Sequence, residues 1–154
     1  MSNNIRAMTR ADLARVGVLV DTNNMFPSEM LPEMTAPFFS GNTVEYRWLV
    51  YDQNGVQGAA YYVPEQLTEG TWNVLLIAVD PQMHEQEIGS RLMRYIEAEL
   101  KHEGNRVLIV ETSGKPDFER TRGFYDMLGY DREARIRDYY AAGDDKIIFR
   151  KELN

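Results

Sequence analysis

The stretch WNVLLIAVDPQMHEQEIGSRL, residues 72–92, contains the pattern that decides the fold. Residues 72–79 become almost entirely apolar toward their end, which is typical of a strand covered on both faces. After Asp80 and Pro81, apolar residues recur at helical spacing as far as Leu100. The sequence therefore predicts a buried strand, near the centre of a sheet, that leads through one turn into a helix.

Further strand and helix signals lie on both sides of this stretch. The pair Asn54-Gly55 predicts a hairpin, and Thr9 followed by Asp12 predicts the start of a helix. One helix is expected to begin near Ile88, and another is expected at residues 117–128. Residues 23–40 are expected to form short helices that are broken at Pro27, Pro32 and Pro37. We expect strands at residues 4–8, 47–51, 56–63, 72–79, 106–110, 130–139 and 146–151.

This order of elements, β-α-α-β-β-β-α-β-α-β-β, predicts a mixed α/β (α+β) fold. It consists of one seven-stranded sheet flanked by about four helices. No repeat, linker or low-complexity segment divides the chain, so residues 3–154 are expected to form a single domain.

Composition excludes several classes of protein. The 154 residues include 17 Lys and Arg and 24 Asp and Glu, a formal net charge of −7 that argues against nucleic-acid binding. The absence of cysteine excludes disulfides, thiolate metal sites and cysteine nucleophiles. The N-terminus does not resemble a signal peptide, and no apolar run approaches the ~20 residues of a membrane span. We therefore expect a cytoplasmic protein with no membrane partner.

The turn after Pro81 has a binding potential of its own. A tight turn into a helix directs free backbone N–H groups and the positive end of the helix dipole at one place, which suits a pyrophosphate. The residues here form neither a P-loop nor the GxGxxG of dinucleotide-binding folds. Taken alone, the turn is more typical of an ordinary connection in which Gly89 lets the helix pack on the sheet.

Two motifs resemble the signatures of the GNAT superfamily of acyl-CoA N-acyltransferases. VDPQMHEQEIGSRLM, residues 79–93, is similar to the acyl-CoA signature, and FYDMLGY, residues 124–130, is similar to the second signature. The segment ARIRDYYAAGDDKIIF, residues 134–149, resembles ribosomal-protein N-terminal acetyltransferases. The resemblance implies the GNAT fold, acetyl-CoA as co-substrate and an amine as acceptor.

The resemblance also implies where acetyl-CoA would bind. Backbone groups of Ile77, Ala78 and Val79 would align the pantetheine arm. The pyrophosphate would be held by the amides of seven consecutive residues: His84, Glu85, Gln86, Glu87, Ile88, Gly89 and Ser90. Because Glu87 stands where the family prefers glycine, its carboxylate is expected to weaken binding by repulsion.

Two residues are candidates for catalysis by the same resemblance. Tyr125 would donate a proton to the departing thiolate, although a core aromatic residue at helical spacing is an alternative. Glu111 would act as the base for the amine, although a structural carboxylate, or a water relayed to backbone groups, would also fit. No metal is expected, since His84 and Glu87 lack the further ligands that zinc requires.

The predicted function is transfer of an acetyl group from acetyl-CoA to a primary amine, of a small molecule or a protein N-terminus. The amine would attack directly in a ternary complex. A non-catalytic acyl-CoA-binding module is the alternative, because His84 and Glu87 depart from the residues that the family prefers in the pyrophosphate turn. A protein that keeps the fold for assembly only is a third hypothesis. Edge strands near the C-terminus are compatible with a homodimer.

Overall fold

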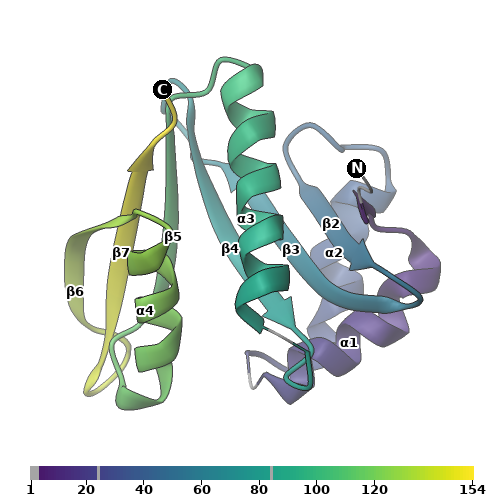
Figure 1. Cartoon of the computed structure of the whole chain (residues 1–154), viewed down its shortest axis with the longest axis horizontal. Coiled ribbons are helices and arrows are strands. Elements are labelled where there is room, and N and C mark those ends of the chain that lie inside the picture. The colour runs from purple at the N-terminus through teal and green to yellow at the C-terminus, as the bar shows by residue number, and fades with distance from the viewer. Residues whose placement is uncertain (1–3, 24, 84) are drawn as a thin grey trace. The chain divides into compact units, whose positions relative to one another are not determined.

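The computed structural model describes residues 4–23, 25–83 and 85–154, which form strands and helices in the predicted order (Figure 1). The strands are β1 Ile5–Ala7, β2 Arg47–Asp52, β3 Val56–Pro64, β4 Thr71–Val79, β5 Val107–Ser113, β6 Asp131–Ala141 and β7 Asp144–Glu152. The α-helices are α1 Leu13–Thr22, α2 Leu31–Phe39, α3 Glu85–His102 and α4 Glu119–Met127. Short 3₁₀ turns are η1 Arg10–Asp12, η2 Ser28–Met30 and η3 Pro116–Phe118.

The strands form one seven-stranded sheet in the order β1-β2-β3-β4-β5-β7-β6. β4 and β5 run parallel, whereas β1–β2, β2–β3, β5–β7 and β6–β7 pair antiparallel. The predicted mixed sheet with four helices is therefore confirmed, and β4 occupies its central position. Within the described residues, no helix is both long and apolar enough to cross a membrane.

The chain divides into two compact units, and the first comprises Met1–Val63 with Leu75–Ile96. In this unit α1 and α2 pack against one face of β2 and β3 (Figure 1). At this face Trp48 and Tyr61 stack with ring centroids 4.2 Å apart. The core that results is assembled from fully buried residues of both layers, among them Val16, Leu19, Val20, Leu31, Trp48, Val50 and Ala59.

The opposite face of β3 receives α3, and a glycine makes room for it. A Cβ atom on Gly58 would lie 2.8 Å from Cγ2 of Ile88 and 3.3 Å from Cδ1 of Leu92. Ile88 and Leu92 are both buried. A glycine inside a strand is usually unfavourable, and here it permits close approach of the helix. Gly58 thus sets how the first half of α3 lies against β3.

The turn between β4 and α3 is fixed by Asp80. Its Oδ1 accepts a hydrogen bond from the backbone N–H of Gln82 at 2.9 Å, and its Oδ2 pairs with Arg15 at 2.8 Å. Arg15 in turn donates from Nε to the carbonyl oxygen of Val56 at 2.8 Å. The Gln82 amide, and after it Arg15, hold the pKa of Asp80 below its usual value. The start of the turn is therefore attached to α1 and to β3.

The second unit comprises Pro64–Val74 with Glu97–Asn154. In it, Thr71–Val74 of β4 pairs in parallel with residues 107–110 of β5, and β7 and β6 extend the sheet. α4 lies over one face of these strands (Figure 1), where Tyr125 packs on Phe149 with ring centroids 5.4 Å apart. The unit is thus a small sheet with α4 on one face.

Two local expectations are wrong. Pro32 and Pro37 do not break a helix, because α2 runs through both. Pro32 lies in the first turn of α2, where an N–H has no intrahelical partner to lose, and burial of Leu31, Thr35 and Phe38 outweighs the interior Pro37. In addition, α3 begins at Glu85 rather than near Ile88. Its first turn is polar, so apolar spacing gave no signal for it.

We predict that Gly58→Ala destabilises the protein, because the new methyl group would overlap the stiff Cγ2 branch of Ile88. Overpacking of this kind costs roughly 1–3 kcal/mol in the free energy of unfolding. Chemical denaturation measures the loss. The control is Gly123→Ala in α4, where a Cβ meets no atom within 4 Å and better helix propensity should stabilise slightly. Equal stabilities of Gly58→Ala and wild type would contradict the packing described.

We further predict that Asp80→Ala lowers the free energy of unfolding by about 1 kcal/mol at neutral pH, because one turn hydrogen bond and one partly screened ion pair are lost. Since the pKa of Asp80 is lowered in the folded state, its stabilisation is complete above the usual Asp pKa of about 3.9. It is lost as the pH falls through the lowered value. Denaturation curves of variant and wild type should therefore converge in strong acid, whereas exposed Asp131→Ala should match wild type throughout.

Candidate active site

The predicted cofactor residues of β4 lie in the first unit. Ala78 and Val79 are buried, and Ile77 is half-buried. The carbonyl oxygen of Val79 accepts a hydrogen bond from Nδ2 of Asn23 at 3.0 Å. Leu75, two residues before Ile77 on the same face, is 46% exposed although β4 is otherwise mostly buried. This part of β4 therefore presents apolar side chains to solvent, which is suited to contact with an apolar ligand segment.

The predicted pyrophosphate residues lie at the start of α3, except for His84, which is outside the described residues. Glu85 and Gln86 are the first two residues of the helix. By helix geometry, the N–H groups of residues 85–87 lack an intrahelical partner. Gly89 is buried in the second turn and Ser90 beside it is half-buried. That these amides hold a pyrophosphate stays a prediction.

Glu87 has a different setting from the one expected. It lies in the first turn of α3 with an exposed side chain, and not in an irregular turn. An acidic side chain at a helix N-terminus interacts favourably with the helix dipole. The position of Glu87 therefore favours a stable helix, and its repulsion of a bound phosphate stays a prediction.

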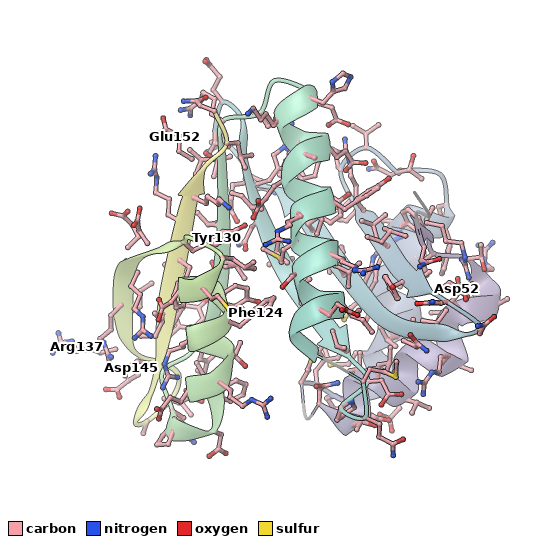
Figure 2. The ribbon with its side chains drawn as sticks, in the orientation of Figure 1. Asp52, Phe124, Tyr130, Arg137, Asp145 and Glu152 are labelled. Atoms are coloured by element: carbon pink, nitrogen blue, oxygen red, sulfur yellow. The ribbon has the colours of Figure 1, made fainter. Side chains whose placement is uncertain are left out.

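Tyr125 lies in the second unit, on the face of α4 that contacts the sheet. It is 5% exposed, and its ring contacts those of Phe124, Tyr130 and Phe149. Figure 2 labels two of these neighbours, Phe124 and Tyr130. Within the described residues, its hydroxyl has no hydrogen-bond partner. Burial raises the pKa of Tyr125 above its usual value, so the phenol stays protonated at neutral and mildly alkaline pH. The ring of Tyr125 thus packs in the core, and its O–H makes no hydrogen bond with the described residues.

Tyr130 provides a contrast within the same unit. Its hydroxyl donates to Oε2 of Glu97 at 2.6 Å, and Lys151 pairs with Oε1 of Glu97 at 3.1 Å. Burial, and after it the charge of Glu97, raise the pKa of Tyr130. Lys151 also donates to the carbonyl oxygen of Leu128 at 2.9 Å, at the end of α4. This phenol is therefore committed to a structural network.

Glu111 lies inside β5, opposite Ile148 of β7, because β5 continues to Ser113 and does not end at residue 110 as predicted. Its Oε1 pairs with Nζ of Lys146 at 2.9 Å. Its Oε2 accepts from Nδ2 of Asn73 at 3.2 Å. Glu111 thus belongs to a charged cluster rather than standing alone at a strand end.

Sequence reasoning did not identify the partners of Glu111. Asn73, which is 2% exposed, also donates to Oε2 of Glu65 at 2.8 Å. Lys146 lies with Nζ 3.7 Å from the ring centroid of Tyr139. The available signals were a polar Asn73 inside an apolar run and a Lys146 at the start of an apolar strand. Among the described side chains, no three His, Asp or Glu residues come together as a metal site would require.

Glu111 and Tyr125 occupy opposite faces of the sheet in the second unit. Tyr125 packs on Phe149, which pairs with Val110, so the side of Val110 and Phe149 faces α4. Because successive residues of a strand point to opposite faces, Glu111 and Lys146 lie on the other side. A substrate that contacts both residues would therefore have to meet them from the two faces of the sheet.

Comparison with known proteins identifies the family. The model of the acetyltransferase (GNAT) domain matches residues 44–132, more than half of the chain. No curated protein matches the sequence.

Solved structures of similar fold cover almost the whole chain. A GNAT-family protein from Desulfovibrio desulfuricans is 29% identical, with a TM-score of 0.89 over 97% of this chain and 98% of that one. The ribosomal-protein-S18-alanine N-acetyltransferase from Escherichia coli is 21% identical, with a TM-score of 0.79 over 99% and 95%. A protein from Salmonella typhimurium, solved with its cofactor acetyl-CoA, is 18% identical, with a TM-score of 0.75 over 99% and 95%. The chain described here therefore belongs to the GNAT acetyltransferase family.

Proposed function

We propose that this protein transfers an acetyl group from acetyl-CoA to a primary amine by direct attack in a ternary complex. The observation that carries the proposal is the phenol of Tyr125, whose ring is buried on α4 and whose pKa is raised by that burial, so that it stays protonated. A protonated hydroxyl that makes no hydrogen bond with the described residues is available to donate its proton. The resemblance of FYDMLGY to the second GNAT signature supports donation to a departing thiolate.

Acetyl-CoA fits the residues of the first unit. The exposed apolar face of β4 at Leu75 and Ile77 is suited to the pantetheine arm, and the free amides of residues 85–87 are suited to the pyrophosphate. A relative of the same fold from Salmonella typhimurium was solved with acetyl-CoA, and an aminoglycoside 6'-N-acetyltransferase with coenzyme A. When bound, the thioester would supply the activated acetyl group.

The chain's own residues would then perform two tasks. The attacking amine must be neutral, and Glu111 would accept its proton directly or through a water. The departing thiolate needs a proton, which Tyr125 would donate. The reaction forms an amide and the free thiol of coenzyme A, so a proton lost by the amine balances the one given to sulfur.

The acceptor that we propose is a small-molecule amine or a protein N-terminus. The Escherichia coli relative acts on an alanine of a ribosomal protein, and the segment 134–149 resembles such enzymes. Relatives of the same fold also include aminoglycoside 6'-N-acetyltransferases. A screen of peptides with different N-termini, aminoglycosides and simple amines, following thiol release from acetyl-CoA, tests the proposal. Binding of acetyl-CoA without turnover of any amine would favour a non-catalytic acyl-CoA-binding module instead.

We predict that Tyr125→Phe lowers kcat by roughly 10² to 10⁴, toward the lower end because thiolates leave readily even unprotonated. The free energy of unfolding and the Kd for acetyl-CoA should stay nearly unchanged, since only a hydroxyl without a partner is removed. Because the pKa of Tyr125 is raised, wild-type kcat should not fall through its ionisation between pH 7 and about 10.

The matched control is Tyr130→Phe, which removes a hydroxyl that is hydrogen-bonded to Glu97. That variant should lose stability more than it loses kcat. Steady-state kinetics and thermal unfolding distinguish the two patterns. Full kcat in Tyr125→Phe, on an acceptor that wild type turns over, would return Tyr125 to a purely structural role.

We predict that Glu87→Gln tightens acetyl-CoA binding by a few-fold at most, because it removes a charge from an exposed position and keeps a good helix former. Glu87→Gly should gain less, since glycine in the first turn of α3 costs helix stability. Isothermal titration calorimetry at low and high salt measures both variants, and salt should reduce the difference from wild type. Weaker binding by Glu87→Gln would show that the carboxylate supports the cofactor site.

A further inference from the structure

The cluster around Glu111 lies entirely in the second unit, on the face of the sheet opposite α4. Glu111 stands opposite Ile148, and Lys146 stands two residues before Ile148 on the same strand. Both side chains therefore project from the same face, and the ion pair joins β5 to β7.

Lys146 is buried to an unusual degree for a lysine. The residue is 8% exposed, and lysines are almost never buried unless they are paired. Burial alone would lower its pKa, but the interactions with Glu111 and Tyr139 outweigh burial and raise it. The side chain is thus a permanent cation, held between a carboxylate on one side and an aromatic ring on the other.

Asn73 holds the other oxygen of the Glu111 carboxylate. Its NH₂ group divides its two N–H bonds between Glu65 and Glu111. Its own Oδ1 is buried and has no hydrogen-bond partner. A core that only had to fill this space would favour an apolar side chain, because the orphaned oxygen is costly. The residue is therefore explained by what its NH₂ group does for the two carboxylates.

We propose that Lys146 is a positioning residue for Glu111, with Asn73 as its counterpart on the second carboxylate oxygen; this inference rests on the proposed function. Lys146 occupies Oε1 and Asn73 occupies Oε2, so the carboxylate is held in one orientation from two strands. A carboxylate has about four acceptor positions, and the two that remain serve the amine acceptor or its water. Without Lys146, the carboxylate would lose both its orientation and its counter-charge.

The surroundings of Glu111 include other charged and titratable groups. Glu65 approaches through Asn73, and Tyr139 packs against Lys146. Burial raises the pKa of Tyr140, the next residue along β6. The charge of Lys146 lowers this pKa and the charge of Glu111 raises it, and the net effect is a raised pKa. With two carboxylates and one ammonium, the cluster keeps one net negative charge, which favours an approaching ammonium acceptor.

A double-mutant cycle in the full-length protein tests the proposal. Lys146→Met, Glu111→Gln and the double variant are assayed with acetyl-CoA and an amine that wild type turns over. Lys146→Met should lower kcat/KM for the amine by about tenfold and leave KM for acetyl-CoA unchanged. In the Glu111→Gln background, Lys146→Met should change kcat/KM by less than about twofold, because Lys146 acts through the Glu111 carboxylate, which that variant lacks.

Lys151→Met is the matched control, because Lys151 lies on the same strand and pairs with another carboxylate, Glu97. Any effect of Lys151→Met on kcat/KM should be the same in both backgrounds. If Lys146→Met does not fold, Lys146→Gln takes its place in the cycle.

Each outcome is decisive. Coupled losses for Lys146 and Glu111, with independent losses for Lys151 and Glu111, support the proposal. Independent losses for Lys146 and Glu111 in an active enzyme overturn it and leave the proposed function standing. No turnover of any amine by wild type overturns the proposed function first.

Discussion

The burial of β4 is the constraint on which the rest of the structure depends. Trp72, Val74, Leu76 and Ala78 are each nearly inaccessible to solvent, and full burial of one large apolar side chain contributes about 1.5–3 kcal/mol. A strand of this kind needs cover along its whole length. Residues 71–74 obtain part of it in the second unit, by pairing with β5, and residues 75–79 obtain it in the first. Neither unit has a complete core without its part of β4.

Patterns of short range made most of this fold predictable. The seven strands were recognisable from β-branched and aromatic runs, and α3 from its apolar spacing. The errors arose where tertiary packing overrode local preference, as at Pro37, or where a polar first turn carried no periodic signal, as at Glu85. For the site, helical spacing already placed Tyr125 on the buried face of α4. The partners of Glu111 were not predictable, because Lys146 lies 35 residues away (146 − 111) and reaches it only through the register of β5 with β7.

The edge strand β6, unlike the central strand β4, is exposed and carries many charged side chains. All residues of β6 are exposed, and the pairing of β6 with β7 is irregular between Arg132 and Ala134. Arg137 and Asp145 lie on this hairpin (Figure 2), and Arg135 pairs with Asp145. Charged side chains and irregular pairing discourage uncontrolled association of edge strands. A homodimer through this edge stays a prediction, and it would have to accommodate these charges.

The buried cation at Lys146 has a consequence for the chemical durability of the protein. Acyl thioesters modify amines only in their neutral form, so a lysine that loses its proton easily is vulnerable to spontaneous acylation. Lys146 retains its proton because its pKa is raised, and it is shielded from solvent by its burial. The ion pair with Glu111 therefore favours the protonated form of Lys146, which does not react with acyl thioesters, and its burial limits contact with them.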